Sequence, residues 1–438
     1  MHRRRFLTNA SALAAFSAVP IIRGRAGEAG KKYRTALIGS GWWGMNILRE
    51  ALASGQIICT ALADVDPAKL TGAADDVKEL TGTEPKKYPD YRELLDKEKP
   101  EIVIIATPDH WHALQTIAAL KAGAHVFVEK PTAHTVNESR AMVRTAKDTG
   151  KVVQVGLHRR IGPHHVSAHQ FLRSGKLGKI GMVRCFVHYP GGAERPKPNA
   201  PAPEGMNWDA WCGPAPLRPF NSKLHPGGWR QFLDFANGQI GDWGVHWLDQ
   251  VMLWTEEKGP RRIFSSGGRP ISGPAVLTDK EMSTDAPESQ IAVFDFEGFT
   301  ATWEHRKFAN NNAEKHSIGT CFYGTEGTLH IGWRDGWTFY PSNEKGKIIH
   351  EDAQLQQPDG HNLTLLWADF MKSIANNTAP AASIEPAHRS SLLPMLANLS
   401  LKLGRSLTWD PDKEQILNDP EAAKGLTRPY RQPWEYPI

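Results

Sequence analysis

Thr35-Ala36-Leu37-Ile38-Gly39-Ser40-Gly41-Trp42-Trp43-Gly44 is the stretch that decides the fold of this chain. A short apolar strand, residues 35–38, runs directly into a GxGxxG pattern, and apolar residues over 47–52 then recur at the spacing of a helix. The glycines of such a turn permit a tight bend and the close approach of a pyrophosphate, which the first amides and the dipole of the helix stabilise. We therefore expect a dinucleotide to bind here. The expected contacts in this turn are Gly39, Gly41, Trp42, Trp43 and Gly44.

Asp64 supplies the second half of the dinucleotide signal. It ends a predicted strand and follows Gly44 at the spacing of about 20 residues at which an acidic residue meets the adenosine ribose. A carboxylate there accepts hydrogen bonds from the ribose hydroxyls and repels a 2′-phosphate, so NAD is expected in preference to NADP. Asp66 is the weaker alternative, because Asp66-Pro67 is typical of the start of the next helix. A glycine turn that binds no nucleotide is disfavoured by the two signals together.

Short apolar strands alternate with amphipathic helices across the first part of the chain. This alternation is typical of a doubly wound parallel sheet with helices on both faces. The expected strands are residues 35–38, 57–63, 102–106, 125–128 and 152–155. We assign residues 32–156 to a Rossmann domain that binds NAD(P).

Residues 157–410 are expected to form a second domain of a different class. Large apolar residues alternate over 290–296 and 299–304, and further strands follow over 316–323 and 328–331. Neighbouring hairpins predict a mostly antiparallel, open-faced sheet, and hence an α+β domain for substrate and oligomer contacts.

Three kinds of segment complete this half. Helices over residues 361–376 and 387–405 are expected to cover other parts of the surface. Residues 190–228 are rich in proline and glycine but also in tryptophan, which favours a lid or binding loop over a linker. Residues 411–438 are expected to form a tail that packs on the body.

The charge of the chain excludes some partners. The formal net charge is +5, and residues 1–28 hold five arginines against one acid, which leaves the remainder close to neutral. A nucleic acid or an anionic membrane surface would find no basic patch, so a small uncharged ligand is favoured. The four cysteines are dispersed, without CxxC pairs or clustered His/Cys spacing, so we expect buried small residues and no metal site.

The first 28 residues are typical of a targeting segment. Arg3-Arg4-Arg5-Phe6-Leu7 fits the twin-arginine pattern, and the apolar run over residues 10–22 is too short to span a membrane. We therefore expect export to the periplasm by the twin-arginine route, with no stable membrane anchor. A disordered basic tail is the alternative.

Two motifs at the carboxyl ends of later strands carry a family resemblance. The chain reads Ala106-Thr107-Pro108-Asp109-His110-Trp111-His112 after one strand and Val128-Glu129-Lys130-Pro131 after the next. Both resemble the TPxxxH and EKP signatures of the glucose-fructose oxidoreductase, inositol dehydrogenase and MocA-like (Gfo/Idh/MocA) family, over nearly the whole chain from residue 34. In that family the EKP lysine reaches the substrate hydroxyl and the nicotinamide, which implies that Lys130 is catalytic.

The same edge of the sheet supplies further cofactor contacts. The resemblance implies that Thr107 and Pro108 touch the nicotinamide half, and that Glu129 and Lys130 complete the cofactor-binding set. His112 belongs to this set or is a packed, hydrogen-bonded histidine that only supports the turn.

Asp242 and His246 lie four residues apart in a segment, residues 238–249, that resembles the DxGxH motif of the family. On a helix they share one face, and a histidine beside a carboxylate can take the proton of a secondary alcohol. We expect His246 to be the general acid/base, Asp242 to orient it and bind a substrate hydroxyl, and Lys130 to stabilise the alkoxide. A helix N-cap aspartate beside a core histidine is the alternative.

Three other side chains are candidates for substrate binding. Arg159 and Arg160 follow the sixth strand, as an arginine-bearing segment does in relatives, although an ion pair would explain either equally well. Trp229 could stack on a sugar ring or simply be core.

These features predict an NAD-dependent oxidoreductase that acts on a secondary hydroxyl of a sugar, polyol or glycoside. An exported enzyme has no obvious pool of free NAD, which favours a tightly bound cofactor recycled within the catalytic cycle. An NAD-dependent glycosidase is the alternative, although Trp243 stands where some relatives have a tyrosine. A non-catalytic sugar- or NAD-binding protein is a third reading. Relatives also imply a homo-oligomer formed through the open sheet face.

Overall fold

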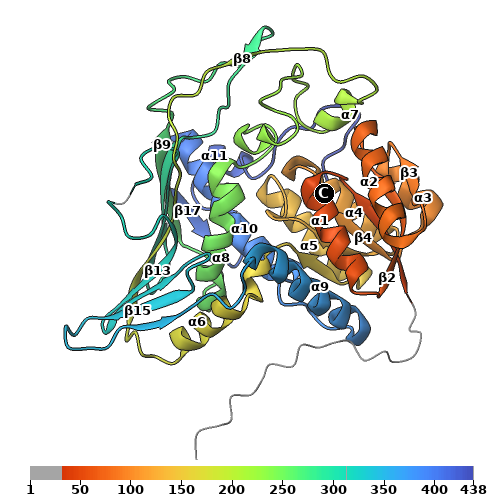
Figure 1. The fold of residues 1–438 in the computed structure, drawn as a ribbon. Helices are drawn as coiled ribbons and strands as arrows, with labels where there is room; N and C mark the ends of the chain where they lie inside the picture. Colours follow the sequence, from red (N-terminus) through yellow and green to blue (C-terminus); the bar gives the residue numbers. More distant parts are fainter. Residues whose placement is uncertain (1–31, 312, 438) are drawn as a thin grey trace, which may run out of the picture.

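The computed structural model describes residues 32–311 and 313–437. The predicted signal segment, residues 1–28, lies outside these described residues. The remainder forms a parallel-sheet domain followed by a domain with a large mixed sheet (Figure 1). None of the helices in the described part combines the length and apolarity that a membrane span requires.

The first domain is a doubly wound Rossmann sheet of six parallel strands in the order β3-β2-β1-β4-β5-β6. Its strands are β1 Tyr33–Ile38, β2 Ile57–Ala63, β3 Lys86–Tyr88, β4 Ile102–Ile105, β5 His125–Val128 and β6 Val153–Val155. Its helices are α1 Trp42–Ala53, α2 Pro67–Thr81, α3 Tyr91–Glu98, α4 Asp109–Lys121 and α5 Val136–Thr149. The order reverses between β1 and β4, which opens a crevice at the carboxyl ends of these two strands.

The second domain is built on ten strands in the order β16-β15-β14-β13-β7-β12-β11-β9-β17-β18. Only β7 and β12 pair in parallel, so the expected mostly antiparallel sheet is confirmed. Its strands are β7 Ile180–His188, β9 Arg262–Gly268, β11 Ser289–Asp295, β12 Thr300–Arg306, β13 Ile318–Gly324, β14 Gly327–Ile331, β15 Trp337–Pro341, β16 Ile349–Glu351, β17 Leu407–Asp410 and β18 Gln415–Ile416. A separate small ribbon pairs β8 Lys197–Pro198 with β10 Glu281–Met282.

Helices α6 Pro163–Arg173, α8 Val245–Trp254 and α10 Ile384–Leu403 pack against this sheet. This half of the chain also contains α7 Trp208–Cys212, α9 Pro358–Asn376 and α11 Pro420–Lys424. In Figure 1, α8 and α10 stand between the sheet and the Rossmann domain. Alternate side chains of the central strands, such as Ala292, Phe294 and Trp303, are fully buried on this inner side. One hydrophobic core therefore runs from the Rossmann sheet through α10 to the second sheet.

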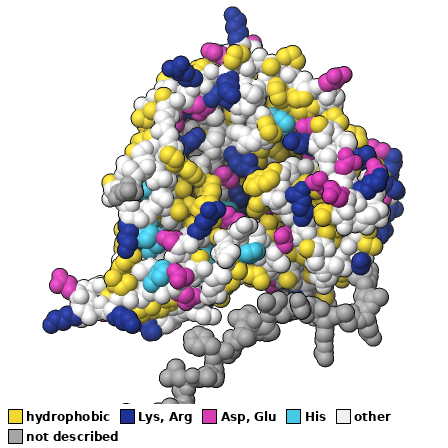
Figure 2. Space-filling view, in the orientation of Figure 1, with side chains coloured by type: hydrophobic (Ala, Val, Ile, Leu, Met, Phe, Trp, Pro, Cys, Tyr) yellow, Lys and Arg dark blue, Asp and Glu magenta, His cyan; other side chains and the backbone are white. Residues whose placement is uncertain are grey.

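Residues 190–228 do not form a simple loop. They carry β8 and α7 and enclose a separate apolar cluster that includes Trp211, Leu224 and Phe235. All four cysteines are free and buried, as expected. On the face drawn in Figure 2, basic and acidic side chains are interspersed.

Candidate functional site

The glycine turn forms one wall of a cavity of about 560 Å³ at the carboxyl edge of the parallel sheet. Gly39 has φ of 92°, and a Cβ there would lie 2.9 Å from the carbonyl carbon of Ala106. Gly41 is the N-cap of α1 without a side-chain cap, and nothing lies within 4 Å of the place where its Cβ would be. The N-terminus of α1 thus borders the cavity, with open space beside Gly41. This arrangement fits a pyrophosphate bound by backbone amides and the helix dipole.

Asp64 faces the same cavity from the end of β2. Its carboxylate accepts hydrogen bonds from the amides of Ser40 (2.7 Å) and Asp66 (2.9 Å). Burial raises the pKa of Asp64 to about 6, so the group is ionised at neutral pH. Each oxygen retains a lone pair for a ribose hydroxyl. Asp66 instead caps α2 by accepting from the amides of Ala68 and Lys69.

The second domain covers the cofactor cleft from the other side. Trp211 and His225, from residues 190–228, line the cavity. Trp434 also lines it and packs edge-on against Trp111 at 4.7 Å between ring centroids. The guanidinium of Arg92 lies 4.9 Å from the Trp434 ring centroid. Segments from three distant parts of the chain therefore surround one cavity.

A smaller pocket of about 240 Å³ adjoins the cofactor cleft. Both cavities are lined by Trp42, Trp43, Ala106, Thr107, Trp229 and Arg230. The pocket brings together Lys130, Asp242 and His246, the three residues expected to be catalytic. It also contains Arg159, His112 and Glu129.

Lys130 and Asp242 form a direct ion pair. Lys130 Nζ donates to Asp242 Oδ1 at 2.7 Å and to the Asp242 carbonyl at 2.9 Å. Arg230 Nε lies 3.4 Å from the same Oδ1. Burial alone would raise the pKa of Asp242, but Lys130 and Arg230 hold it below its usual value.

The partner of Asp242 differs from the expected one. Asp242 lies in a π-helical turn, Ile240–Gly244, that precedes α8. A π turn is wider than an α turn, so positions four apart no longer stack as the sequence pattern assumed. The carboxylate consequently orients Lys130, and not His246.

His246 lies in the first turn of α8, and its ring stacks on that of His158 at 5.0 Å. Burial, together with the charges of Arg159 and Lys130, lowers the pKa of His246 well below its ordinary value. The imidazole is therefore neutral at physiological pH and able to accept a proton. Within residues 32–311 and 313–437, its buried Nδ1 has no hydrogen-bond partner.

The two adjacent arginines have different environments. Arg159 lines the pocket, with its guanidinium 4.5 Å from the Trp247 ring centroid and 3.8 Å from Asp359. Burial lowers the pKa of Arg159 to about 10, so it stays charged. Arg160 points elsewhere and pairs through two nitrogens with buried Asp249, at 3.0 and 2.6 Å. Of the two, only Arg159 is placed to meet a substrate.

The motif residues of the Rossmann edge hold one another in place. The ring nitrogens of His112 lie 2.8 Å from the carbonyls of Pro131 and Thr107, so this histidine supports both turns while it also lines the pocket. Pro108 is the N-cap of α4 and lines the cofactor cleft. The Glu129 carboxylate accepts the Lys130 amide at 3.1 Å, and burial raises the pKa of Glu129.

Sequence reasoning missed several pocket residues. Asp109 is buried against Lys130 and Arg230, and burial raises its pKa to about 8. Asp109 is part of the TPxxxH motif, but the motif did not indicate that this side chain is buried, because its burial depends on the second domain. Asp359 begins α9, far along the chain, and no local pattern marked it.

A glycine-turn nucleotide cleft that adjoins a pocket with a lysine, an aspartate and a histidine defines a dinucleotide-binding protein of the oxidoreductase type. Two family models match. One, an oxidoreductase family with an NAD-binding Rossmann fold, covers residues 33–157. The other, the C-terminal α/β domain of the same oxidoreductase family, covers residues 186–265 and 342–436. The chain therefore belongs to the Gfo/Idh/MocA oxidoreductase family.

Individual relatives match over shorter stretches. A glycosyl hydrolase family 109 protein of Stenotrophomonas maltophilia (strain K279a) is 32% identical over 189 residues, 41% of this chain and 40% of that protein. Levoglucosan dehydrogenase of Pseudarthrobacter phenanthrenivorans is 40% identical over 95 residues, 22% of this chain and 24% of that enzyme. These matches span less than half the length of either relative.

A solved structure agrees over more of the chain. Levoglucosan dehydrogenase in complex with NADH and levoglucosan aligns with a TM-score of 0.67 and 22% identity, over 86% of this chain and 99% of that chain. At this identity the likeness is one of fold.

Proposed function

We propose that this protein is an NAD-dependent oxidoreductase that oxidises or reduces a secondary hydroxyl of a sugar, polyol or glycoside. The carrying observation is the pocket of Lys130, Asp242 and His246, which opens onto the cofactor cleft through shared wall residues. Bound NAD supplies the hydride acceptor. The residues that fit it are the glycine turn at the phosphates, Asp64 at the ribose, and Thr107 and Pro108 at the nicotinamide end.

The pocket residues then divide the proton chemistry. Neutral His246 accepts the hydroxyl proton of the substrate, because burial keeps its imidazole uncharged. The Lys130 ammonium stabilises the alkoxide that develops as the proton leaves. Asp242 fixes the Lys130 ammonium by two contacts and can accept a second substrate hydroxyl. Arg159 and Trp229 supply a charged group and an aromatic face for the remainder of the substrate.

An NAD-dependent glycosidase is the second candidate. The family 109 glycosyl hydrolase relative supports it, and so does Tyr189, whose ring lies 6.3 Å from that of Trp243, a residue of the pocket wall. The Tyr189 hydroxyl accepts a hydrogen bond from Gln239 at 2.6 Å. Sequence reasoning had looked for a tyrosine beside the histidine and found Trp243 there; Tyr189 instead directly follows β7, which ends at His188.

A tightly held, internally recycled cofactor is part of this proposal. The covered cleft, with Trp211 and Trp434 on the side opposite the glycine turn, supports slow release of the nucleotide.

We also propose export by the twin-arginine route and assembly through the outer sheet face, where Met182, Phe264 and Ile291 are exposed. Replacing Arg3 and Arg4 by lysine should keep the protein in the cytoplasm if the export proposal holds.

The deciding experiment starts with protein that lacks residues 1–28. The protein is denatured, and the released nucleotide is identified and counted. Native protein is then mixed with sugars, inositols and glycosides while the absorbance of reduced nicotinamide is followed. Near one NAD(H) per chain that cycles between its two forms supports the proposal. Absence of bound nucleotide, together with no binding of added NAD, would sink both the cofactor and the catalytic assignments.

The same samples separate the two candidates. A dehydrogenase leaves an oxidised product and a reduced nicotinamide or second substrate. A glycosidase releases the aglycone with no net change in the nicotinamide. A protein that binds NAD and sugar without product would be the non-catalytic alternative.

A further inference from the structure

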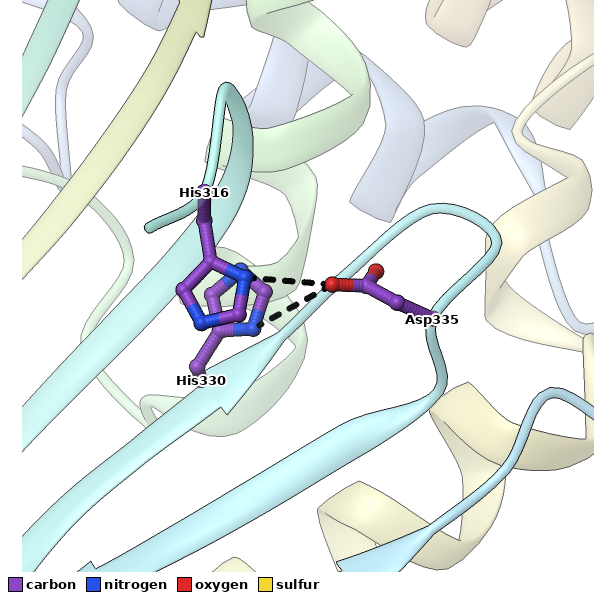
Figure 3. Close-up of side chains that lie close together, drawn as sticks. All are labelled: His316, His330 and Asp335. Atoms are coloured by element: carbon purple, nitrogen blue, oxygen red, sulfur yellow. Dashed lines mark hydrogen bonds and ion pairs between the residues drawn. The ribbon is translucent and has the colours of Figure 1, made fainter. Parts of the chain in front are cut away.

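Two histidines and an aspartate of the second domain lie close together, and none of them lines the pocket (Figure 3). His316 lies two residues before the start of β13, His330 lies in β14, and Asp335 lies in the turn between β14 and β15. Asp335 Oδ2 is 3.1 Å from His316 Nδ1 and 4.0 Å from His330 Nδ1. The two imidazole rings are stacked, with centroids 3.6 Å apart.

His330 is fixed in a tautomer that leaves Nδ1 free. Its side chain is 2% exposed, and Nε2 lies 3.3 Å from the Ile318 carbonyl, which can only accept. Nε2 therefore carries the hydrogen and Nδ1 carries a lone pair. Nδ1 is buried and has no hydrogen-bond partner in the described part of the chain. Gly319 makes room for this ring, since a Cβ there would lie 2.5 Å from Nε2.

The groups around this lone pair favour a cation. Asp335 Oδ2 lies 4.0 Å from His330 Nδ1 and 3.1 Å from His316 Nδ1. The electron pair of the buried His330 Nδ1 thus faces a carboxylate. The nearby Lys315 ammonium points to the Tyr340 hydroxyl, 2.7 Å away.

We propose that His316, His330 and Asp335 bind a divalent transition-metal cation of the zinc class. Two imidazole nitrogens and one carboxylate are ligands that Zn²⁺ prefers, and the bonded distances are about 2.0–2.2 Å. The three ligand atoms lie within 4.8 Å of one another, so small movements of the rings would complete the site, and water would take the fourth position. A histidine that binds a metal through one ring nitrogen usually donates a hydrogen bond from the other nitrogen to an acceptor that orients the ring. The Ile318 carbonyl is that acceptor for His330.

A second group of similar composition lacks these features. His188, Glu304 and Glu314 also lie close together. There, however, Arg184 pairs with Glu304 at 3.0 Å, and Arg306 pairs with Glu314 at 2.7 Å. Guanidinium groups already neutralise those carboxylates, so that group needs no metal.

The proposed metal would stiffen a turn that supports the active pocket. Asp335 follows Trp333, whose Nε1 donates to Asp359 Oδ1 at 3.1 Å. The Trp333 ring also packs edge-on against Trp243 at 5.0 Å, and both Asp359 and Trp243 line the pocket. The bound metal would have a structural role, so this proposal does not depend on the proposed reaction.

The test uses tag-free protein that lacks residues 1–28 and has been stripped of metal with a chelator. Zn²⁺ is titrated calorimetrically, and Co²⁺ is added to a second sample to record its d–d absorption. We expect one saturable site, a rise in Tm with Zn²⁺, and Co²⁺ bands of a low-coordinate site. Asp335→Asn and His316→Gln should each weaken Zn²⁺ binding by at least about 100-fold.

The matched control is His350→Gln, which removes the exposed His350–Asp352 pair with its 3.0 Å contact. It should leave Zn²⁺ binding unchanged. Asp335 is 51% exposed, so Asp335→Asn is expected to fold normally. The proposal is overturned if wild-type protein shows no saturable Zn²⁺ or Co²⁺ binding, or if both variants bind as the wild type does.

Discussion

Lys130 combines the two conditions that a catalytic ammonium must meet. It lies at the carboxyl end of a parallel strand, where ligands of this fold bind, and it is only 14% exposed. Its ion pair with Asp242 offsets the cost of holding a charge there. The same pair fixes the ammonium toward the pocket and leaves donors for a substrate oxygen.

Lys130→Met is therefore expected to slow turnover strongly while NAD remains bound. The loss in kcat should be roughly 10²–10⁴-fold, because one positioned group that stabilises a developing charge is removed. The measurement is single-turnover reduction of the bound nicotinamide, together with the nucleotide content after denaturation. Lys97→Met, on the exposed side of α3, is the matched control. A variant that retained wild-type turnover would remove Lys130 from the mechanism.

At the residue scale, the structure brings Lys130, Asp242 and His246 to one pocket, while their catalytic roles stay predictions. Lys130 could be located in advance because strand ends occupy known positions in a doubly wound fold, whereas His246 was located only by the resemblance to the DxGxH motif. Arg159 and Arg160 could not be separated, since neighbouring residues in a short 3₁₀ turn point in different directions. Which of them faces the pocket depends on Asp249, which comes from α8.

Among the elements, α10 joins the two domains through a cluster of charges. Arg140 of α5 pairs with Glu385 of α10 at 3.0 Å and also with Glu414. His388 Nε2 lies 3.0 Å from Glu414. Burial alone would raise the pKa of Glu414, but His388 and Arg140 lower it from 4.5 to about 2.

Glu414→Gln should destabilise the protein by about 2–3 kcal/mol at neutral pH. Because the folded-state pKa lies below the unfolded value, the stabilisation is present above pH 4.5 and is lost as the pH falls toward 2. The gap in unfolding free energy between wild type and variant should therefore close over that window in denaturant titrations. The exposed Glu421→Gln serves as control and should change stability by less than about 1 kcal/mol at any pH. A gap independent of pH would refute the assignment.

The segment around Trp434 forms a wall of the cofactor cleft. Trp434→Ala should speed release of NAD by roughly tenfold, which corresponds to about 1.4 kcal/mol. The reason is that the ring lines the cavity and packs on Trp111 there. Fluorescence of bound NADH during displacement by excess NAD measures this rate. Tyr436→Phe, which only loses a hydroxyl contact with Thr135, should release NADH at the wild-type rate. Equal rates in all three proteins would show that this wall does not retain the nucleotide.

Longer elements and continuous apolar runs were predicted closely, and the short or irregular ones were not. The strand predicted over residues 125–128 matches β5, and the helices predicted over 361–376 and 387–405 match α9 and α10 to within three residues at each end. β3, Lys86–Tyr88, was missed because it is short and carries two exposed lysines at the edge of its sheet. The apolar residues of the segment 190–228 show no helix or strand periodicity, because its tryptophans pack against one another and not along one face of a helix.

For the whole molecule, the large sheet leaves one face without helices. Ile291 of β11 is 54% exposed on this outer face, and Phe264 of β9 is 43% exposed. The register pairs Val293 with Phe264, and Val293 lies two positions from Ile291 along β11, which places these three apolar side chains on one surface. Exposed apolar side chains grouped on an uncovered sheet face are typical of subunit contacts.

Ile291→Lys should convert the proposed oligomer to monomers. A charge in a packed interface is expected to weaken assembly by at least about 100-fold, and light scattering after size exclusion reports the mass. Ile58→Lys, at a 45% exposed position of β2 in the other domain, is the control and should assemble normally. Wild-type protein that is monomeric at micromolar concentration would contradict the assembly proposal.

The enclosure of the cofactor cleft has a consequence for the order of events during synthesis. The glycine turn emerges from the ribosome early, whereas Trp434, on the far wall, emerges only after both sheets have been made. The nucleotide can be fully surrounded only when that late segment is in place. On the proposed export route, NAD would therefore have to be loaded in the cytoplasm, and a chain that crossed the membrane before folding would arrive without it.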